Sequence, residues 1–329
     1  MSASAGSPVL TTNTDSHDIV LTIDGLTHSY GSHQVLDGLD LSLDRGEQLG
    51  LLGPNGSGKS TAFAIVAGLL PLTGGQIEFE GQPIGDGRAF RARLGVVFQS
   101  PSLDPSLSCQ QNLELAASLQ GIRGELARTR VRSQLELAGL SDRAASQVKT
   151  LSGGMRRRLD IGRALLHEPA LILMDEPTSG LDEAAFRATW DRLAAVRRER
   201  ELSILVTTHR PEEAERCDRI AILHHGKVVA SGTPAALKAQ VASDVVVLTG
   251  PDPEALATVV RERFSLPVLV DSHRQSIRVE AEQGHTLIPR LVEAFDEGRL
   301  TSVELRRPTL ADVFLKVTGA ALDAEVQHG

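Results

Sequence analysis

The sequence predicts an α/β protein with a small α+β domain at its carboxyl end, and three observations support this fold class. Short, mainly apolar segments at residues 48–52 and 171–174 are typical of parallel strands buried on both faces. Helical patterns alternate with such strands over residues 19–240, and a separate set of strands and helices follows over residues 244–319. A chain of 329 residues is long enough for two domains.

The composition limits the partners of the protein. The formal net charge is −8, so we expect no nucleic acid partner and no general affinity for anionic lipid, which a basic face would provide. No apolar segment approaches the roughly 18 to 20 residues of a membrane-spanning helix, so any membrane role must come through a partner. Cys109 and Cys217 are expected to be reduced and partly buried. Residues 1–18 are predicted to be a disordered tail, and residues 320–329 a second tail.

The first folded segments alternate apolar and polar residues. Residues 19–23, 26–30 and 35–43 are predicted strands separated by turns, and residues 76–80 form a further strand beyond the first helix. We therefore expect an antiparallel β layer at the start of the chain. Tyr30, the single tyrosine in the sequence, stands beside a turn, where an aromatic side chain is more often a packing residue than a ligand contact.

A glycine-rich stretch joins the strand at residues 48–52 to a helical pattern at residues 62–70. Its glycines let the backbone approach an anion, and its N–H groups and the positive end of the helix macrodipole would surround a β-phosphate. Lys59 would place its charge between the β- and γ-phosphates, and Ser60 would ligate Mg²⁺. The whole stretch consists of Gly53, Pro54, Asn55, Gly56, Ser57, Gly58, Lys59, Ser60 and Thr61. This pattern predicts a phosphate-binding loop.

Beyond this helix the chain forms a further strand and then turns helical. Residues 94–98 are a predicted apolar strand, and Gln99 stands where that strand meets a loop. Residues 100–150 are mostly helical in pattern, and residues 112–119 and 126–138 are their clearest amphipathic stretches. We interpret this region as a helical subdomain.

A Ser-Gly-Gly turn precedes the helical pattern of residues 155–166. Ser152 is suited to cap that helix, and Ser152, Gly153 and Gly154 offer a second backbone site for an anion. This second site lacks a lysine, which suggests that the two sites share one phosphate. The arginines at positions 156–158 are interpreted as a solvated helix face, with phosphate contact as the alternative.

Adjacent carboxylates follow the buried strand at residues 171–174. Asp175 and Glu176 would repel each other in a low-dielectric site unless a cation compensates, and the Mg²⁺ of a nucleotide supplies that charge. We therefore expect Asp175 to hold the Mg²⁺ shell and Glu176 to polarise the attacking water, a role typically worth about 10²- to 10⁴-fold in rate. An acidic pair that caps a helix is the alternative. His209 follows another buried strand, at residues 203–207, from whose end it could reach a γ-phosphate.

The remaining elements complete the two domains. Helices are predicted at residues 183–200, 212–216 and 234–240, and a hairpin at residues 220–223 and 227–230. The carboxyl-terminal region has the order strand, helix, two strands, helix, strand, helix. Its clearest parts are residues 245–248, 255–264, 277–280 and 287–295.

Together, these motifs resemble the ATPase subunit of an ABC transporter over about residues 19–237. The resemblance rests on the order and spacing of the phosphate loop, Gln99 as the Q-loop, residues 151–154 as the signature, Asp175 and Glu176 as Walker B, residues 179–182 as the D-loop, and His209 as the switch histidine. It implies a P-loop NTPase cassette with a mixed core sheet, an antiparallel β layer and a helical subdomain. ATP and Mg²⁺ are the implied cofactors.

The resemblance also implies roles for single residues. Tyr30 corresponds to the aromatic residue that stacks on adenine. Nucleotide contacts from the signature and the D-loop would come from Ser152, Gly153, Gly154 and Asp182 of a second copy, in a head-to-tail dimer. The implied catalytic residues are Lys59, Gln99, Glu176 and His209, and the implied Mg²⁺ ligands are Ser60, Gln99 and Asp175.

Two segments resemble one branch of the family. LSGGMRRRLDIGRALLHEP at residues 151–169 and PTLADVFLKVTG at residues 308–319 are similar to exporter ATPases of the daunorubicin-resistance and nodulation type. This branch implies efflux of a drug, lipid or polysaccharide-like substrate through separate integral membrane permease subunits, with the ATPase on the cytoplasmic side of the membrane. It also implies that residues 244–319 are an accessory domain, which we expect to stabilise a dimer or regulate the ATPase and to be dispensable for nucleotide binding. The sequence departs from the wider family at Met155, where glutamine is commoner, and at residues 210–211.

Two other functions remain open from the sequence. An importer ATPase differs from the exporter only in the carboxyl-terminal motif. A soluble ABC ATPase that acts without a membrane partner usually carries two cassettes, whereas this sequence has a single Gly-Lys-Ser loop.

Overall fold

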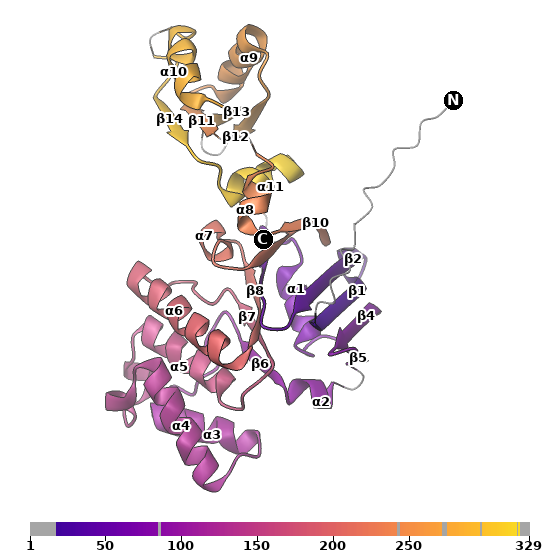
Figure 1. Ribbon diagram of the computed structural model, residues 1–329, viewed down its shortest axis with the longest axis vertical. Coiled ribbons are helices and arrows are strands. Elements are labelled where there is room, and N and C mark those ends of the chain that lie inside the picture. Colours follow the sequence, from indigo (N-terminus) through magenta and orange to yellow (C-terminus); the bar gives the residue numbers. More distant parts are fainter. Residues whose placement is uncertain are drawn as a thin grey trace.

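The computed structural model describes residues 18–84, 87–241, 244–271, 275–296, 298–320 and 322. The two predicted tails lie largely outside the described residues. Within the described part of the chain, the strands form a four-stranded antiparallel sheet, a six-stranded mixed sheet and a second four-stranded antiparallel sheet. Figure 1 shows the last of these in a separate lobe above the cassette, with helices α8 and α11 between the two.

The antiparallel β layer has the strand order β2-β1-β4-β5. The two segments predicted at residues 19–23 and 26–30 form one strand, because shifts of pairing register around Asp24 and Gly25 let the chain continue without a turn. The inward side chains of this layer, such as Leu21 and Leu39, are buried in the main core. The strands are β1 (Ile19–Tyr30), β2 (His33–Asp44), β4 (Gly74–Phe79) and β5 (Gln82–Pro83).

The core sheet has the strand order β10-β9-β3-β8-β7-β6. Neighbours from β9 to β6 run parallel, and β10 pairs antiparallel with β9. The central strands consist almost entirely of buried residues, as expected for parallel strands covered on both faces. The strands are β3 (Gln48–Leu52), β6 (Leu94–Val97), β7 (Leu171–Asp175), β8 (Ser203–Thr208), β9 (Arg219–His224) and β10 (Lys227–Gly232).

The helices of the cassette cover this sheet and form the helical subdomain. Helix α1 (Lys59–Val66) begins inside the phosphate loop and ends four residues before the predicted end, because Gly68 has a left-handed φ of +73°. Buried leucines such as Leu113 and Leu159 hold the subdomain together. The other helices are α2 (Arg88–Arg91), α3 (Cys109–Leu119), α4 (Gly124–Ala138), α5 (Gly153–Leu165), α6 (Glu183–Arg200), α7 (Pro211–Ala214) and α8 (Pro234–Lys238). None of the helices in the described residues is both long and apolar enough to cross a bilayer.

The carboxyl-terminal lobe has the predicted order of elements and forms a split βαβ sandwich. Its strand order is β12-β13-β11-β14, and α9 and α10 share an apolar cluster with one face of the sheet. The last helix, α11 (Leu310–Thr318), packs on α8 and on strands of the cassette, and the same apolar cluster includes Val245 of β11. The other elements are β11 (Asp244–Thr249), α9 (Pro253–Phe264), β12 (Val268–Asp271), β13 (Ser276–Ala281), α10 (Gly284–Glu293) and β14 (Ser302–Arg306).

Candidate functional site

The candidate functional site lies at the carboxyl ends of four neighbouring parallel strands. The sheet order β3-β8-β7-β6 brings together the segments that leave those strands. The phosphate loop follows β3, His209 follows β8, Asp175 and Glu176 stand at the end of β7, and Gln99 follows β6. Ligands of open α/β sheets bind at this edge. The fold therefore places the phosphate loop and four further motif residues on one edge, although they are spread over about half of the chain.

The phosphate loop is compact and tightly packed. A Cβ atom at Gly53 would lie 2.4 Å from the Leu223 carbonyl oxygen, and Gly58 has a φ of +107°, so both positions need glycine. The Lys59 side chain is 5% exposed, and its Nζ donates to the Pro54 carbonyl at 2.7 Å. Ser60 is exposed in the first turn of α1. The N–H groups at this helix start, the lysine and the serine hydroxyl form a cradle suited to a phosphate.

Glu176 is held by two of the predicted catalytic residues. Gln99 Nε2 donates to Glu176 Oε2 at 3.1 Å, and His209 Nδ1 lies 2.6 Å from Glu176 Oε1. The hydrogen bond from His209 lowers the pKa of the Glu176 carboxyl, and the same bond raises the pKa of His209. Both shifts favour an ion pair, in which a carboxylate able to orient water is fixed on two sides.

Asp175 is more enclosed than Glu176. Burial raises the pKa of the Asp175 carboxyl, the charge of Glu176 raises it further, and a hydrogen bond donated by the Thr207 hydroxyl opposes the rise. A divalent cation would relieve this repulsion. Ser60, Gln99 and Asp175 supply oxygen atoms, the ligand type that Mg²⁺ prefers, and so fit this ion. Among the described residues no group of three or more His, Cys, Asp and Glu side chains is arranged to hold a metal ion without further ligands.

The signature and the D-loop are helix starts that face solvent. The Ser152 hydroxyl caps α5 by accepting from the Met155 N–H at 3.3 Å, as the sequence predicts. Asp182 caps α6 in the same way, at 2.8 Å from the Ala185 nitrogen. Ser152, Gly153 and Asp182 are all exposed. A surface hollow beside them is lined by residues that include Gln99, Gly153, Arg156, Ser179 and Gly180.

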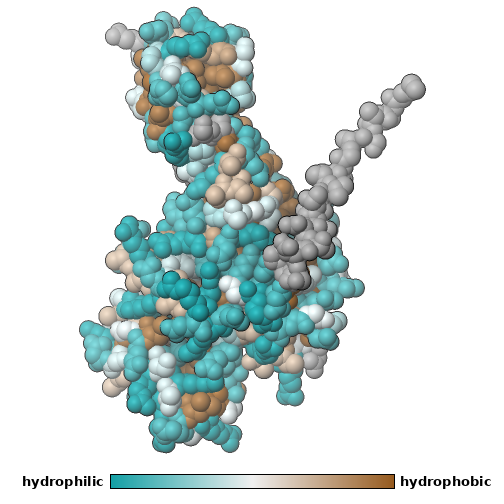
Figure 2. Space-filling view, in the orientation of Figure 1, coloured by the Kyte–Doolittle hydropathy of each residue, from teal (hydrophilic) through white to brown (hydrophobic). Residues whose placement is uncertain are grey.

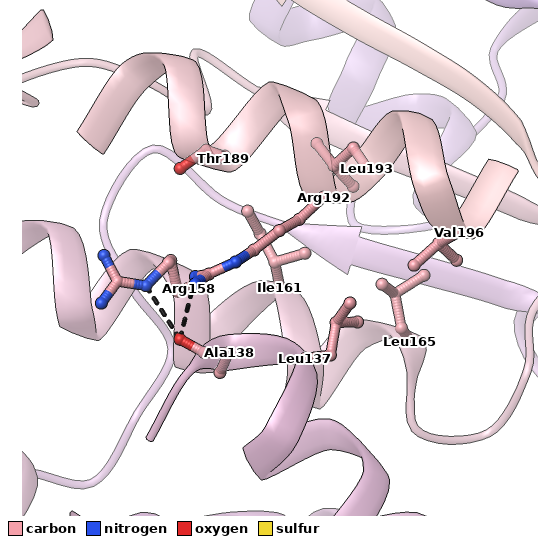
Figure 3. A pocket seen from close by; sticks show the side chains of 9 residues that line it. All are labelled: Leu137, Ala138, Arg158, Ile161, Leu165, Thr189, Arg192, Leu193 and Val196. Atoms are coloured by element: carbon pink, nitrogen blue, oxygen red, sulfur yellow. Dashed lines mark hydrogen bonds between the residues drawn. The ribbon is translucent and has the colours of Figure 1, made fainter. Parts of the chain in front are cut away.

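The interpretation of the arginine run as a solvated face fits only one of its three members, Arg156. Arg156 is exposed, but Arg157 is 3% exposed and lies inside the protein. Arg158 Nε donates to the Ala138 carbonyl at 2.9 Å, and Arg192 Nη1 of α6 donates to the same oxygen at 3.0 Å, which ties the end of α4 to α5 and α6 (Figure 3). A helix at the surface of a domain must turn one side inward, and position 157 lies on that side.

Other residues of the site carried no motif signal. Glu213 is 1% exposed and accepts from the Thr178 hydroxyl at 2.7 Å, and burial raises the pKa of its carboxyl. It links α7, just after His209, to Thr178, the residue before the D-loop. Tyr30, by contrast, is 52% exposed at the end of β1, edge-on to His28 with ring centroids 4.9 Å apart. Its open face suits stacking on a base.

Comparison with known proteins identifies the family. Residues 36–179 match the model of the ABC transporter family. The chain is 39% identical over 306 residues to a Nod factor export ATP-binding protein I of Paraburkholderia xenovorans, covering 92% of this chain and 98% of the relative. It is 36% identical over 306 residues to the daunorubicin resistance ATP-binding protein DrrA3 of Streptomyces coeruleorubidus, covering 92% and 96%.

A solved structure agrees with these sequence relatives. The dimeric ATP-binding cassette MJ0796, in a post-hydrolysis state with bound ADP and phosphate, matches with a TM-score of 0.59 and 29% identity over 65% of this chain and 98% of that one. The fold, the motif geometry and the relatives lead to the same conclusion. The chain belongs to the ABC transporter family, as an ATP-binding and ATP-hydrolysing subunit of its exporter-type branch.

Proposed function

We propose that the edge of the core sheet binds Mg·ATP and that Glu176 activates the water that attacks the γ-phosphate. The observation that carries this proposal is the position of the Glu176 carboxylate between Gln99 and His209, across from the phosphate loop. The loop from Gly53 to Thr61 would hold the phosphates, and Lys59 would neutralise the β- and γ-oxygens. Tyr30 would stack on the adenine ring.

In this proposal the Mg²⁺ that accompanies ATP would be held by Ser60, Gln99 and Asp175, and it would supply positive charge to the phosphate oxygens. Asp175 remains a carboxylate beside Glu176 when that charge is present. Glu176 accepts a proton from water, and His209, which is already its partner, keeps the carboxylate oriented. Gln99 holds the other carboxylate oxygen.

We further propose a head-to-tail dimer in which each ATP is closed in by the other copy. The helix start at Ser152, Gly153 and Gly154, of which the first two are exposed, offers N–H groups without a lysine, and the exposed Asp182 offers a carboxylate. They would complete a site whose lysine is Lys59 of the other copy. The dimeric state of a related cassette supports this arrangement.

The test is Glu176→Gln, which removes the charge of the base and retains its shape. We expect ATP and Mg²⁺ binding to persist and steady-state hydrolysis to fall at least about 10²-fold. Because ATP is then not consumed, light scattering should show a stable dimer in the presence of Mg·ATP.

Lys59→Ala is the matched control, since it should weaken nucleotide binding and give no such dimer. Normal turnover by Glu176→Gln would exclude Glu176 as the base. A Glu176→Gln protein that binds ATP but stays monomeric at high protein concentration would contradict the head-to-tail dimer.

The relatives suggest the transport role of this site. They are named for Nod factor export and daunorubicin resistance, so we propose a drug, lipid or polysaccharide-like cargo. The chain would act peripherally, on the cytoplasmic side of the membrane, by binding integral membrane permease subunits that carry the cargo contacts.

A further inference from the structure

Arg157 places a guanidinium inside the protein, two turns before the carboxyl end of the signature helix α5. Its side chain is 4% exposed, and Asp160, which is fully buried, lies 3.8 Å away between Nη1 and Oδ2. Asp160 also accepts from Arg163 Nε at 2.9 Å. Buried charges of this kind persist only when they are paired and hydrogen-bonded. The hydrogen-bond partners of Arg157 therefore indicate the role of its buried side chain.

Those partners are backbone carbonyls of the catalytic loops. Arg157 Nη2 donates to the carbonyls of Glu176 at 2.8 Å and Asp175 at 3.3 Å. Arg157 Nε donates to the Pro177 carbonyl. Arg157 Nη1 donates to the carbonyl of Phe98, the residue before Gln99. One planar group thus contacts the end of β7 and the end of β6. Because the guanidinium fork is rigid, it fixes these two segments relative to each other and to α5.

The backbone of Glu176 needs such a support. The φ angle of Glu176 is +43°, in the left-handed region that residues other than glycine rarely adopt. Its N–H donates to the Thr207 carbonyl at 3.0 Å, and its own carbonyl accepts from Arg157. Hydrogen bonds thus hold both the N–H and the carbonyl of Glu176, and its carboxylate is directed toward Gln99 and His209.

We propose that Arg157 is a positioning residue for ATP hydrolysis, which sets the orientation of Glu176 and Gln99 from the signature helix. This inference rests on the proposed role of Glu176 as the base. Because α5 begins at the signature, a displacement of this helix when the signature meets nucleotide would be passed through Arg157 to the hydrolytic carboxylate. We expect ATP affinity to change little without Arg157, since the phosphate loop that would hold most of the nucleotide lies on other elements.

The experiment compares steady-state ATPase kinetics of the full-length protein carrying Arg157→Met or Arg157→Lys. For Arg157→Met we expect kcat to fall at least about tenfold, a part of what a general base contributes, with the KM for ATP within about twofold of wild type. Arg157→Lys keeps a charge and three donors but not the planar fork, so it should recover part of kcat. Arg198→Met, on the exposed face of α6, is the matched control and should leave both constants unchanged.

Two results would overturn the inference. One is unchanged kcat in Arg157→Met. The other is that both Arg157 variants lose kcat, show an equal rise in KM and no longer bind ATP. Arg157 would then stabilise the fold in general and would not position the catalytic residues. If Arg157→Met does not fold, Arg157→Lys tests the inference instead, and we then expect a lower kcat with an almost unchanged KM for ATP. Glu176→Gln is measured in parallel, so that failure of this inference can be told apart from failure of the proposed base. Normal ATP turnover by Glu176→Gln would reject Glu176 as the base, whatever the Arg157 variants show.

Discussion

Glu176 and His209 influence each other's protonation through one short contact. The pKa of His209 is raised above its ordinary value of 6.5, and the pKa of Glu176 is lowered below its ordinary value of 4.5. The stabilisation from His209 is complete below pH 6.5 and is lost as the pH rises through its raised pKa. The stabilisation from Glu176 is complete above pH 4.5 and is lost as the pH falls through its lowered pKa. Both contributions are therefore complete between pH 4.5 and pH 6.5.

We predict that Glu176→Gln lowers the pKa of His209, because the carboxylate that stabilises the imidazolium is gone. NMR titration of the histidine ring signals measures this shift directly. His167, whose ring lies 3.1 Å from the Leu94 carbonyl, serves as the internal reference and should titrate as in the wild type. An unchanged His209 pKa in the variant would mean that the two residues are not coupled in solution.

At the scale of elements, α11 joins the two lobes. Its apolar face, with Leu310, Val313 and Phe314, is buried in a cluster that also contains Leu52, the residue before the phosphate loop. The Phe314 ring is edge-on to His224, with centroids 5.7 Å apart. The opposite side of α11 carries Asp312, which is bonded by Arg278 and Arg306 of the carboxyl-terminal sheet. The predicted second tail also contributes, since Leu322 is buried in the same cluster.

We propose that the lobe at residues 244–306 stabilises a dimer or regulates the ATPase, whereas α11 stabilises the cassette. Removal of one large buried side chain typically costs about 2–5 kcal/mol, against a net domain stability of about 5–15 kcal/mol. We predict that a chain stopped after Gln240 has a clearly lower melting temperature. Replacing residues 244–306 with a flexible linker, which keeps α11, should preserve ATP affinity and lower the melting temperature less, because the contacts of α11 with the cassette remain. The linker can be short, because Val245 and Arg306 are paired on neighbouring strands, which brings the two ends of the replaced segment together.

Thermal unfolding and ATP titration of the two shortened proteins test this division. Equal melting temperatures for both would assign α11 no role in the cassette. Loss of ATP affinity in a folded protein that retains α11 would show that the lobe itself takes part in nucleotide binding. Unaltered dimerisation, ATPase activity and export would leave the lobe without the proposed role.

At the scale of the whole molecule, a surface groove lies between β6 and the helical subdomain. The groove is lined by residues that include Phe98, Leu115, Leu119 and His167. Leu119 is 80% exposed and Leu115 is 48% exposed, and Figure 2 shows hydrophobic residues on the lower surface of the helical subdomain, in the region of α3 and α4. Because Phe98, which lines the groove, directly precedes Gln99, we propose that a permease segment docks here.

We predict that Leu119→Asp abolishes transport in cells and co-purification of the full-length protein with its permease, and that ATP binding is retained. A charge at this position would have to be buried without a partner on docking. Leu126→Asp, at an exposed leucine of α4 outside the groove lining, is the control and should retain both properties. Normal transport by Leu119→Asp would place the permease contact elsewhere.

Most residues of the candidate nucleotide site could be proposed from the sequence, because their chemistry is local. The phosphate loop needs glycines, a lysine and a hydroxyl within one strand-turn-helix segment, and Asp175 and Glu176 are adjacent at the end of a wholly apolar strand. The order of strands and helices followed from periodicity for the same reason, including the carboxyl-terminal lobe. The residue types and spacings of the sequence therefore determined the fold class, the family and the candidate site residues.

The tertiary structure alone decided which charged and apolar surfaces meet. Three consecutive arginines have the same local pattern, and only the packing of α5 against β6 and β7 buries Arg157 and leaves Arg156 in solvent. The apolar face of α11 predicts a partner but not which one, and the fold buries it between the cassette and β11 rather than in the cluster beneath α9 and α10. Both outcomes depend on contacts between segments far apart in the chain, which neither spacing nor periodicity encodes.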